Sequence, residues 1–451
     1  MDKIGTDVEL KPPSARYRWL VFFFISMAMF GNYYIYDSIS PLADLLKAQL
    51  GYSDANIGLL NAIYSFPNII MVLIGGLIID RIGTRKSVLI FTVLVMLGAV
   101  ITALSGNLLL MATGRLIFGL GAESMIVAIT TILARWFKGK ELSFAFGLNL
   151  TFARLGSFLA LNSPTWGRSL YTSWQKPLLV TAVAGMMALF FIGIYCLLDL
   201  MASRRFLLPQ ESKQDKIELR EIFRFGAGFW YITALCVTFY SAMFPFQTFA
   251  IKYFQEAHGT SREVGGNLSS MLTLAAMIFT PLFGLVADRT RRKAWLMALG
   301  SLLIIPVYLI MAYHIDLATP LGFHDIINIK FSFFGINSSI PAYLIIPMAM
   351  MGIAFSLVPA VMWPMVAIIV DNNRLGTAYG LMTMIQNIGL FSFNIIIGLA
   401  NDFTGASADN PGGYNLGMWI FSLLGFCGLL FAFLLGRYER SIPQEKIKED
   451  G

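Results

Sequence analysis

The sequence predicts an all-α integral membrane protein in which twelve transmembrane helices form two pseudo-symmetric six-helix bundles, with both termini in the cytoplasm. Three observations point to this fold class. The chain of 451 residues is too apolar for a soluble protein, apolar runs long enough to cross a bilayer recur along it, and its two halves carry related loops.

The composition excludes most other classes of protein. Hydrophobic residues make up 57% of the chain and charged residues only 13%, whereas soluble domains carry about 25% charge. Twelve crossings of about 20 residues each would consume roughly 240 residues, which fits this apolar excess. The three cysteines all fall inside apolar runs, which argues against disulfides and against a metal site. A soluble enzyme, a disordered chain and a disulfide-stapled secreted module are excluded, and no cofactor is implied.

The apolar runs define the individual helices. They are expected at 19–41, 55–79, 86–105, 107–134, 141–164, 175–199, 226–252, 264–287, 294–314, 342–370, 375–400 and 415–436. A long polar insertion in the middle of the chain separates six helices from six. The predicted domains are a cytoplasmic tail, an N-terminal bundle, a cytoplasmic linker, a C-terminal bundle and a second tail, at 1–18, 19–200, 201–225, 226–436 and 437–451.

The basic residues predict the orientation of the helices. With the N-terminus in the cytoplasm, most Lys and Arg residues fall in cytoplasmic segments, as the positive-inside rule requires. Two arginines, Arg115 and Arg154, lie within apolar runs. The outer loops hold only Lys47, Arg168, Lys176, Lys252, Arg262 and Lys330.

The loops after the second and eighth predicted helices are related. One reads Gly76-Leu-Ile-Ile-Asp80-Arg81-Ile-Gly83-Thr-Arg85-Lys86, and the other reads Gly284-Leu-Val-Ala-Asp288-Arg289-Thr-Arg291-Arg292-Lys293. The Gly (76 to 284) and the Asp (80 to 288) are each displaced by 208 residues, close to half the chain. A repeat of six-helix units is typical of transporters whose substrate site lies near the midplane between the halves.

The first of these loops resembles the signature loop of the major facilitator superfamily at every defined position. The pattern Arg115-x-x-x-Gly119-x-Gly121-Ala122 is a second element similar to that family. Further segments resemble the lysosomal dipeptide-transporter subfamily and keep the same order through both halves. They are Gly31–Asp37, Tyr64–Asn68, Gly121–Ser124, Trp136–Leu142, Ala153–Ser157, Phe244–Phe246, Trp363–Ala367, Leu375–Gly380 and Ile385–Asn387.

This resemblance implies a twelve-helix carrier that works by alternating access and moves short peptides down their gradient without an obligatory coupled ion. In the superfamily the signature loop acts as a latch that stabilises the state closed to the cytoplasm. Carried over to this sequence, Asp80, Arg81 and Arg85 form the main latch. Asp288 and Arg289 form a partial copy, which lacks the glycine of the first loop. Simple positive-inside anchoring is the alternative interpretation of both loops.

The same resemblance bears on location and partners. The first 18 residues contain no acidic-dileucine sorting signal, so we expect a prokaryotic homologue in the cell (inner) membrane rather than a lysosomal protein. The expected partners are the lipid bilayer and a small-molecule substrate, with dipeptides as the implied class. Nucleic acid is not expected, and the sequence does not imply an accessory membrane protein.

Glu123 and Arg154 are the strongest candidates for substrate binding. Each lies near the middle of a predicted helix, where an ionisable side chain costs roughly 2.5–3.5 kcal/mol or more on insertion scales. A zwitterionic peptide carries an ammonium and a carboxylate, and the planar fork of Arg binds both carboxylate oxygens. The two residues therefore predict a two-ended peptide site. The alternative is a structural ion pair between their helices.

The other candidates are polar or aromatic residues at membrane depth. Arg115 lies about two turns from Glu123 on one helix, which indicates either tuning of Glu123 and gating, or packing. Asp37 is a candidate for an outer gate. Asn32, Tyr33 and Tyr36 form a stripe on the first helix that either lines a cavity or anchors the helix at the interface. The remaining candidates for an aromatic-walled pocket, with ordinary packing as the alternative, are Tyr64, Tyr240, Gln247, Trp363, Gln386 and Asn387.

Three functions stay open at this stage. The first is an alternating-access uniporter of short peptides. The second is a proton-coupled carrier of amino acids or small organic anions, which is disfavoured if an arginine pairs with Glu123 and holds its charge. The third is a receptor that binds peptides without transporting them. We find no H-E-x-x-H motif, nucleotide-binding loop or nucleophile–base pair, so the chain is not expected to be an enzyme.

Overall fold

The computed structural model describes residues 13–137, 141–206, 225–290, 292–322, 326–331, 336–371 and 374–441. The long helices of the first half are α1 (Ala15–Asp37), α3 (Asp54–Ile82), α4 (Thr84–Leu104), α5 (Leu108–Phe137), α6 (Leu142–Leu161) and α8 (Gln175–Arg205). Those of the second half are α9 (Ala227–His258), α10 (Arg262–Arg289), α11 (Lys293–Ala312), α12 (Ala342–Ile369), α13 (Leu375–Thr404) and α14 (Asn415–Glu439). The shorter elements are α2 (Ala43–Leu50), α7 (Ser163–Trp166), β1 (Ile326–Phe331) and β2 (Ile336–Pro341).

These helices match the predicted membrane crossings. Eleven segments of the described residues are long and apolar enough to span a bilayer, and α3 makes a twelfth when its two parts count as one span. Those parts, Asp54–Met71 and Ile74–Ile82, are bent by 57° relative to each other. Each predicted helix overlaps an observed one. The prediction of twelve transmembrane helices is therefore confirmed.

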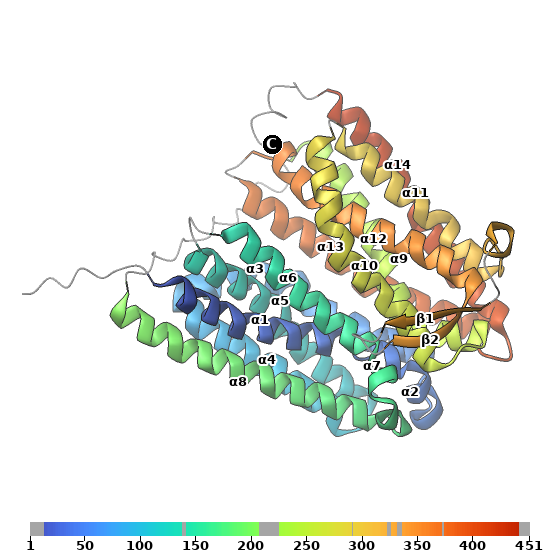
Figure 1. Ribbon diagram of the computed structural model, residues 1–451, viewed down its shortest axis with the longest axis horizontal. Coiled ribbons are helices and arrows are strands. Elements are labelled where there is room, and N and C mark those ends of the chain that lie inside the picture. The colour runs from blue at the N-terminus through green and yellow to red at the C-terminus, as the bar shows by residue number, and fades with distance from the viewer. Residues whose placement is uncertain are drawn as a thin grey trace, which may run out of the picture.

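The helices pack as two groups that meet at one end. Within the first group α4 packs on α5 and α8, and α1 packs on α6 and α8; within the second, α11 packs on α12 and α14, and α9 packs on α13 and α14. The groups contact each other mainly through α3 with α13 and α6 with α10. Figure 1 shows them converging at the end that carries α2, α7 and the two strands, and diverging at the opposite end. By the predicted orientation the converging end is the outer one.

Two elements differ from the sequence prediction. Strands β1 and β2 form an antiparallel hairpin within 315–341, a segment for which no strand was predicted. Helix α9 continues to His258, whereas the predicted helix ends at 252 and places Lys252 in an outer loop. The helix continues because Lys252 is buried between the two halves, where its charge is paired, so this polar stretch is not a solvated connection.

A buried ion pair closes the outer end. Lys252 Nζ contacts the two carboxylate oxygens of Asp54 at 2.6 and 2.8 Å, and Asn401 Nδ2 donates to the same carboxylate at 3.0 Å. The side chain of Lys252 is 0% exposed and that of Asp54 is 1% exposed. Charges buried this deeply are tolerated only when they are paired. Because the partners come from opposite halves, the pair depends on the closed outer end.

Further contacts support this closure. Asp402 of α13 accepts hydrogen bonds of 2.8 Å from the backbone N–H groups of Asp54 and Ala55, at the N-terminus of α3, where a carboxylate is favoured. A Cβ atom on Gly58 of α3 would lie 2.3 Å from the backbone oxygen of Asn394 on α13, so only glycine allows this approach. Helices α3 and α13 are thus held together at the outer end by hydrogen bonds and close packing.

The cytoplasmic end is organised differently. Asp199 of α8 has a fully buried carboxylate that lies 3.1 Å from Arg85 Nε and 3.5 Å from Arg135 Nη1. All three residues belong to the first half. Of the predicted latch residues, Arg85 is therefore paired within its own half. The others, Asp80, Arg81, Asp288 and Arg289, have exposed side chains.

Candidate substrate site

A cavity of about 290 Å³ lies between the two halves. Its walls come from α1, α3, α5 and α6 of the first half and from α9, α12 and α13 of the second. This volume is at the lower end of the range of small-molecule sites, roughly 300–1,000 Å³. The cavity occupies the position between the halves that the internal repeat predicts.

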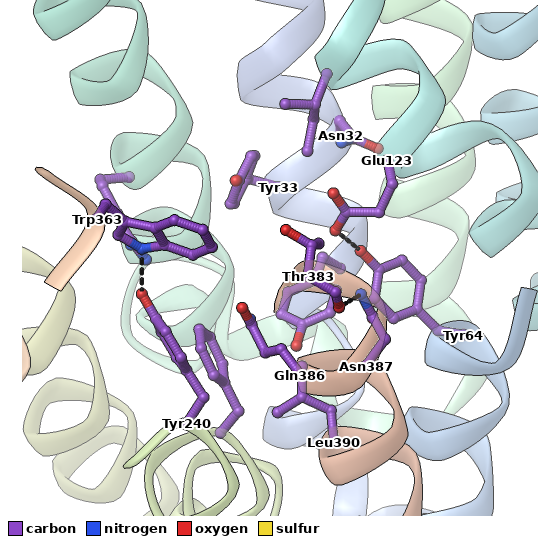
Figure 2. A pocket seen from close by; sticks show the side chains of 14 residues that line it. Asn32, Tyr33, Tyr64, Glu123, Tyr240, Trp363, Thr383, Gln386, Asn387 and Leu390 are labelled. Carbon is purple, nitrogen blue, oxygen red and sulfur yellow. Dashed lines mark hydrogen bonds between the residues drawn. The ribbon is translucent and has the colours of Figure 1, made fainter. Parts of the chain in front are cut away.

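Glu123 projects into this cavity from α5. Its Oε1 atom accepts a hydrogen bond of 2.9 Å from the hydroxyl of Tyr64 on α3 (Figure 2). The two helices approach closely because a Cβ atom on Gly119 would lie only 2.3 Å from the backbone oxygen of Tyr64. The glycine at this position therefore serves helix contact, and through Tyr64 it fixes the orientation of the carboxylate.

Arg154 enters the same cavity from α6. Its guanidinium lies over the ring of Phe355, 5.2 Å from the centroid. Within the described part of the chain it has no hydrogen bond or ion pair, and it is not paired with Glu123. The structural ion pair considered from the sequence is therefore not formed. The cavity instead presents one anionic and one cationic side chain that are both open to a ligand.

The opposite wall of the cavity is aromatic and amide-rich. Trp363 Nε1 donates to the hydroxyl of Tyr240 at 3.1 Å, and Gln386 accepts a weak hydrogen bond of 3.6 Å from the thiol of Cys236. Figure 2 shows Trp363 and Tyr240 across the cavity from Glu123 and Tyr64. Since these wall residues come from the second half, the cavity exists only where the two halves face each other.

Two amide oxygens beside the cavity have unused acceptor capacity. Among the described residues, the Oδ1 atoms of Asn32 and Asn387 are buried without a hydrogen-bond partner. The Nδ2 atom of Asn387 donates to the backbone oxygen of Thr383 at 3.0 Å. A buried acceptor without a partner costs free energy. The cavity is thus chemically suited to a ligand that carries N–H donors.

Most of the predicted substrate-binding residues come together here. The cavity is lined by Glu123, Arg154, Asn32, Tyr33, Tyr36, Tyr64, Tyr240, Trp363, Gln386 and Asn387. Gln247 does not line it; this residue is buried in α9, and its backbone oxygen accepts a hydrogen bond from Ser40. The cavity also includes Ile126, Phe244, Thr383 and Leu390, which the sequence analysis did not select. Ile126, Thr383 and Leu390 are uncharged and resemble ordinary packing residues, so no sequence signal distinguishes them, whereas Phe244 lies in the segment Phe244–Phe246 that resembles the dipeptide-transporter subfamily.

Arg115 and Asp37 do not line the cavity. Arg115 is buried and donates to the backbone oxygens of Leu60 (3.0 Å) and Ile35 (3.2 Å), which ties α5 to α3 and to the end of α1. Its guanidinium also lies 5.8 Å from the centroid of the Tyr64 ring. Arg115 therefore contacts the tyrosine that binds Glu123 rather than Glu123 itself. Asp37 ends α1 and is partly exposed.

Comparison with known proteins identifies the family. The sequence profile of the Major Facilitator Superfamily matches residues 21–327 and 247–450. The chain belongs to this superfamily. It is therefore a multi-pass membrane protein and a secondary transporter, not an enzyme.

Individual relatives and structures agree with this assignment. The chain is 32% identical over 408 residues to the lysosomal dipeptide transporter MFSD1 of Bos taurus, covering 87% of this chain and 81% of the relative. It is 31% identical to the Homo sapiens protein of the same name, covering 87% and 82%. A probable sulfoacetate transporter, SauU of Cupriavidus necator, is 22% identical over 277 residues, covering 57% of this chain and 61% of the relative.

Solved structures confirm the fold. A bacterial homologue of the human lysosomal transporter Spinster, in an inward-facing and unoccupied conformation, superposes with a TM-score of 0.73 at 17% identity, covering 96% of this chain and 100% of the other. The nucleoside transporter NupG superposes with a TM-score of 0.70 at 13% identity, covering 92% and 98%. The predicted fold of two six-helix bundles is thus the superfamily fold.

Proposed function

We propose that this chain is a uniporter of dipeptides that works by alternating access. The observation that carries the proposal is that Glu123 and Arg154 face one cavity without pairing with each other. A dipeptide zwitterion supplies the missing partner for each, its ammonium for Glu123 and its carboxylate for Arg154. Charge-assisted hydrogen bonds of this kind are roughly twice as strong as neutral ones. The names of the MFSD1 relatives support the same substrate class.

The distribution of the site between the halves fits a carrier. Both charged side chains belong to the first half, whereas Trp363, Gln386 and Asn387 belong to the second. When the predicted bundles 19–200 and 226–436 rock against each other, the contacts to the peptide ends stay on one bundle. The aromatic and amide contacts from the other bundle change. The ligand is therefore held while access to it switches sides.

The aromatic wall fits a carrier that accepts varied side chains. Tyr36, Tyr240, Phe244 and Trp363 offer flat apolar surface to a ligand. Such surfaces adapt to different apolar groups because their contacts are not directional. The two charged residues then recognise what every dipeptide shares, its free ends.

Proton coupling is the second candidate function. The sequence argument against it assumed that an arginine pairs with Glu123. In the structure the described partner of this carboxylate is the Tyr64 hydroxyl, a neutral group. Without an ion pair to hold its charge, Glu123 is free to exchange a proton with the cavity. A transmembrane pH gradient that drives accumulation of substrate would distinguish this candidate from uniport.

The membrane in which the carrier works remains a prediction from the sequence. We propose the cell (inner) membrane of a prokaryote, with a dipeptide as the small-molecule partner. The proposed function does not require an accessory membrane protein, because both charged groups of the site lie within this one chain.

Ligand binding by end-blocked peptides tests the proposed site. Titration calorimetry of the purified protein should detect Ala-Ala, and binding should be lost when either the amine is acetylated or the carboxyl is amidated. Arg154→Ala should make the binding free energy of Ala-Ala less favourable by roughly 2–5 kcal/mol, because the peptide carboxylate then lies buried and unpaired. This variant should no longer distinguish Ala-Ala from its amide. Glu123→Gln should likewise lose the distinction between Ala-Ala and its N-acetyl form.

Arg168→Ala is the matched control, since this arginine is exposed at the outer end and lies outside the cavity. Undiminished binding of Ala-Ala by Arg154→Ala would show that Arg154 does not bind the peptide. Undiminished binding of N-acetyl-Ala-Ala by the wild type would contradict a role for Glu123 in reading the amine.

A further inference from the structure

A second cavity, of about 260 Å³, adjoins the first. It lies between α6, α10 and α12, and it shares Arg154, Tyr240 and Trp363 with the substrate cavity. The hydrogen-bonded pair of Trp363 and Tyr240 therefore stands between the two spaces, with Arg154 beside it. A group bound to Arg154 has access to both.

The two cavities differ in chemistry. Apart from the shared arginine, none of the described residues that line the second cavity is charged, and its walls include Leu150, Met277, Pro281 and Pro359. It contains no counterpart of Glu123, Asn32, Gln386 or Asn387. A space of this kind favours an apolar group, since its walls are mostly hydrocarbon and offer few hydrogen bonds.

Arg154 links the apolar space to the carboxylate site. Its guanidinium lies over the ring of Phe355, and Phe355 lines the second cavity but not the first. A carboxylate that binds this guanidinium is therefore held at the mouth of the second cavity. Figure 2 shows Tyr240 and Trp363, which also border that mouth, on the side opposite Glu123.

We propose that the second cavity is a subsite for the side chain of the C-terminal residue of the peptide, and that it selects large apolar side chains there. This inference rests on the proposed function. In a peptide the C-terminal side chain branches from the carbon atom that bears the carboxylate, so a carboxylate on Arg154 places that side chain beside the apolar space. The N-terminal side chain branches from the carbon that bears the ammonium, at the Glu123 end. The two side chains of a dipeptide thus contact different walls of the site.

The asymmetry predicts a preference between sequence isomers. Ala-Phe and Phe-Ala have the same composition and the same charged ends, but only Ala-Phe places its ring in the second cavity. Wild-type protein should therefore bind Ala-Phe more tightly than Phe-Ala. The expected factor is roughly 10–200, the discrimination that an apolar pocket provides for a missing apolar group.

Filling the second cavity tests the assignment. Gly147 lines this cavity but not the first, and a Cβ atom there meets nothing within 4 Å, so Gly147→Phe adds a ring at the wall of this cavity from an unobstructed backbone position. The matched control is Gly193→Phe on α8, where a Cβ atom also meets nothing within 4 Å. Titration calorimetry with Ala-Ala, Ala-Phe and Phe-Ala should show that Gly147→Phe removes the preference for Ala-Phe over Ala-Ala, while Gly193→Phe retains it.

The outcomes separate this inference from the proposed function. If the wild type binds no unmodified dipeptide, the peptide proposal fails and the subsite fails with it. If the wild type binds dipeptides but Phe-Ala is bound as tightly as Ala-Phe, or if Gly147→Phe keeps the preference for Ala-Phe, only the subsite is overturned. Loss of a co-purified lipid from Gly147→Phe, detected by mass spectrometry, with unchanged peptide preferences would assign the cavity to an acyl chain and would also overturn it.

Discussion

The two ends of the molecule use their charges in opposite ways. At the outer end, Lys252 and Asp54 come from different halves and pair in a fully buried position. At the cytoplasmic end, Arg85 and Arg135 pair with Asp199 inside the first half. The outer pair therefore stabilises one arrangement of the halves, whereas the cytoplasmic cluster is compatible with their separation.

For the proposed alternating access, this difference identifies the contacts that must change between the two states. The state closed to the outside is stabilised by charges that would be solvated once the outer end opens. In the predicted cytoplasmic latch, Arg85 is paired with Asp199 and Arg81 is exposed. These two residues therefore do not hold the two halves together in this state. Opening outward requires the outer pair to separate and new contacts to form at the cytoplasmic end. Substitutions at each end should consequently shift the same equilibrium.

The largest effect is expected from Lys252→Met. In the outer-closed state this substitution removes the buried cation that contacts Asp54 at 2.6 Å and leaves only the more distant Lys47, at 3.9 Å, so it costs about 3–5 kcal/mol, whereas in the open state the carboxylate is hydrated. The population of the outward-open state should rise by roughly 2–4 orders of magnitude. A thiol placed by Thr383→Cys, in a background without Cys196, Cys236 and Cys427, should then react faster with an impermeant maleimide applied from outside.

Two variants control this measurement. Lys176→Met removes an exposed outer lysine whose hydrogen bond among the described residues is to Thr172 of its own half, and it should leave the labelling rate at the wild-type value. Adding Asp54→Asn to Lys252→Met removes the buried carboxylate that has lost its closest cation and should restore much of the closure. An unchanged labelling rate in Lys252→Met would show that the buried pair does not hold the outer end shut.

A smaller shift is expected from Gly58→Leu. The new side chain collides with the backbone of α13 at Asn394, and overpacking of this kind costs about 1–3 kcal/mol. Outside labelling of the same reporter thiol should increase by roughly 5- to 150-fold. Gly193→Leu, at a position with open space, should have no effect. Equal labelling of both leucine variants would show that the contact between α3 and α13 does not hold the outer end closed.

The smallest effect is expected from Arg168→Ala. Arg168 lies 3.0 Å from Glu263 across the two halves, but its side chain is 83% exposed. Exposed ion pairs contribute about 0–1 kcal/mol because water and salt screen them. The labelling rate should change by less than roughly fivefold. A shift as large as that of Lys252→Met would refute the claim that burial, rather than the number of ion pairs, determines closure.

The sequence predicted the fold well because membrane helices must satisfy their backbone internally and cover themselves with apolar side chains. The exceptions are instructive. Lys252 was placed in an outer loop because a lysine beside an apolar run normally marks a helix end, and its partner Asp54 lies 198 positions away in sequence. Such a pairing depends on which helix faces meet, and that information is not local.

The candidate site was predictable to a similar extent. Glu123 and Arg154 could be selected because ionisable residues in the middle of apolar runs are costly unless they serve a site. Their lack of mutual pairing could not be predicted, since it depends on side-chain directions in α5 and α6. Asp199 was missed for a related reason: near the end of α8 it resembles an ordinary polar flank, yet it is fully buried between two arginines.

Counterflow in proteoliposomes tests the central claim, peptide transport through the Glu123 and Arg154 site, most directly. Vesicles loaded with unlabelled Ala-Ala should take up radiolabelled Ala-Ala without a pH gradient or ion gradient, and Arg154→Ala should abolish this uptake. Unlabelled N-acetyl-Ala-Ala and Ala-Ala amide should fail to compete. Binding without counterflow would make the chain a receptor, and counterflow of free amino acids or organic anions but not of dipeptides would contradict the substrate assignment.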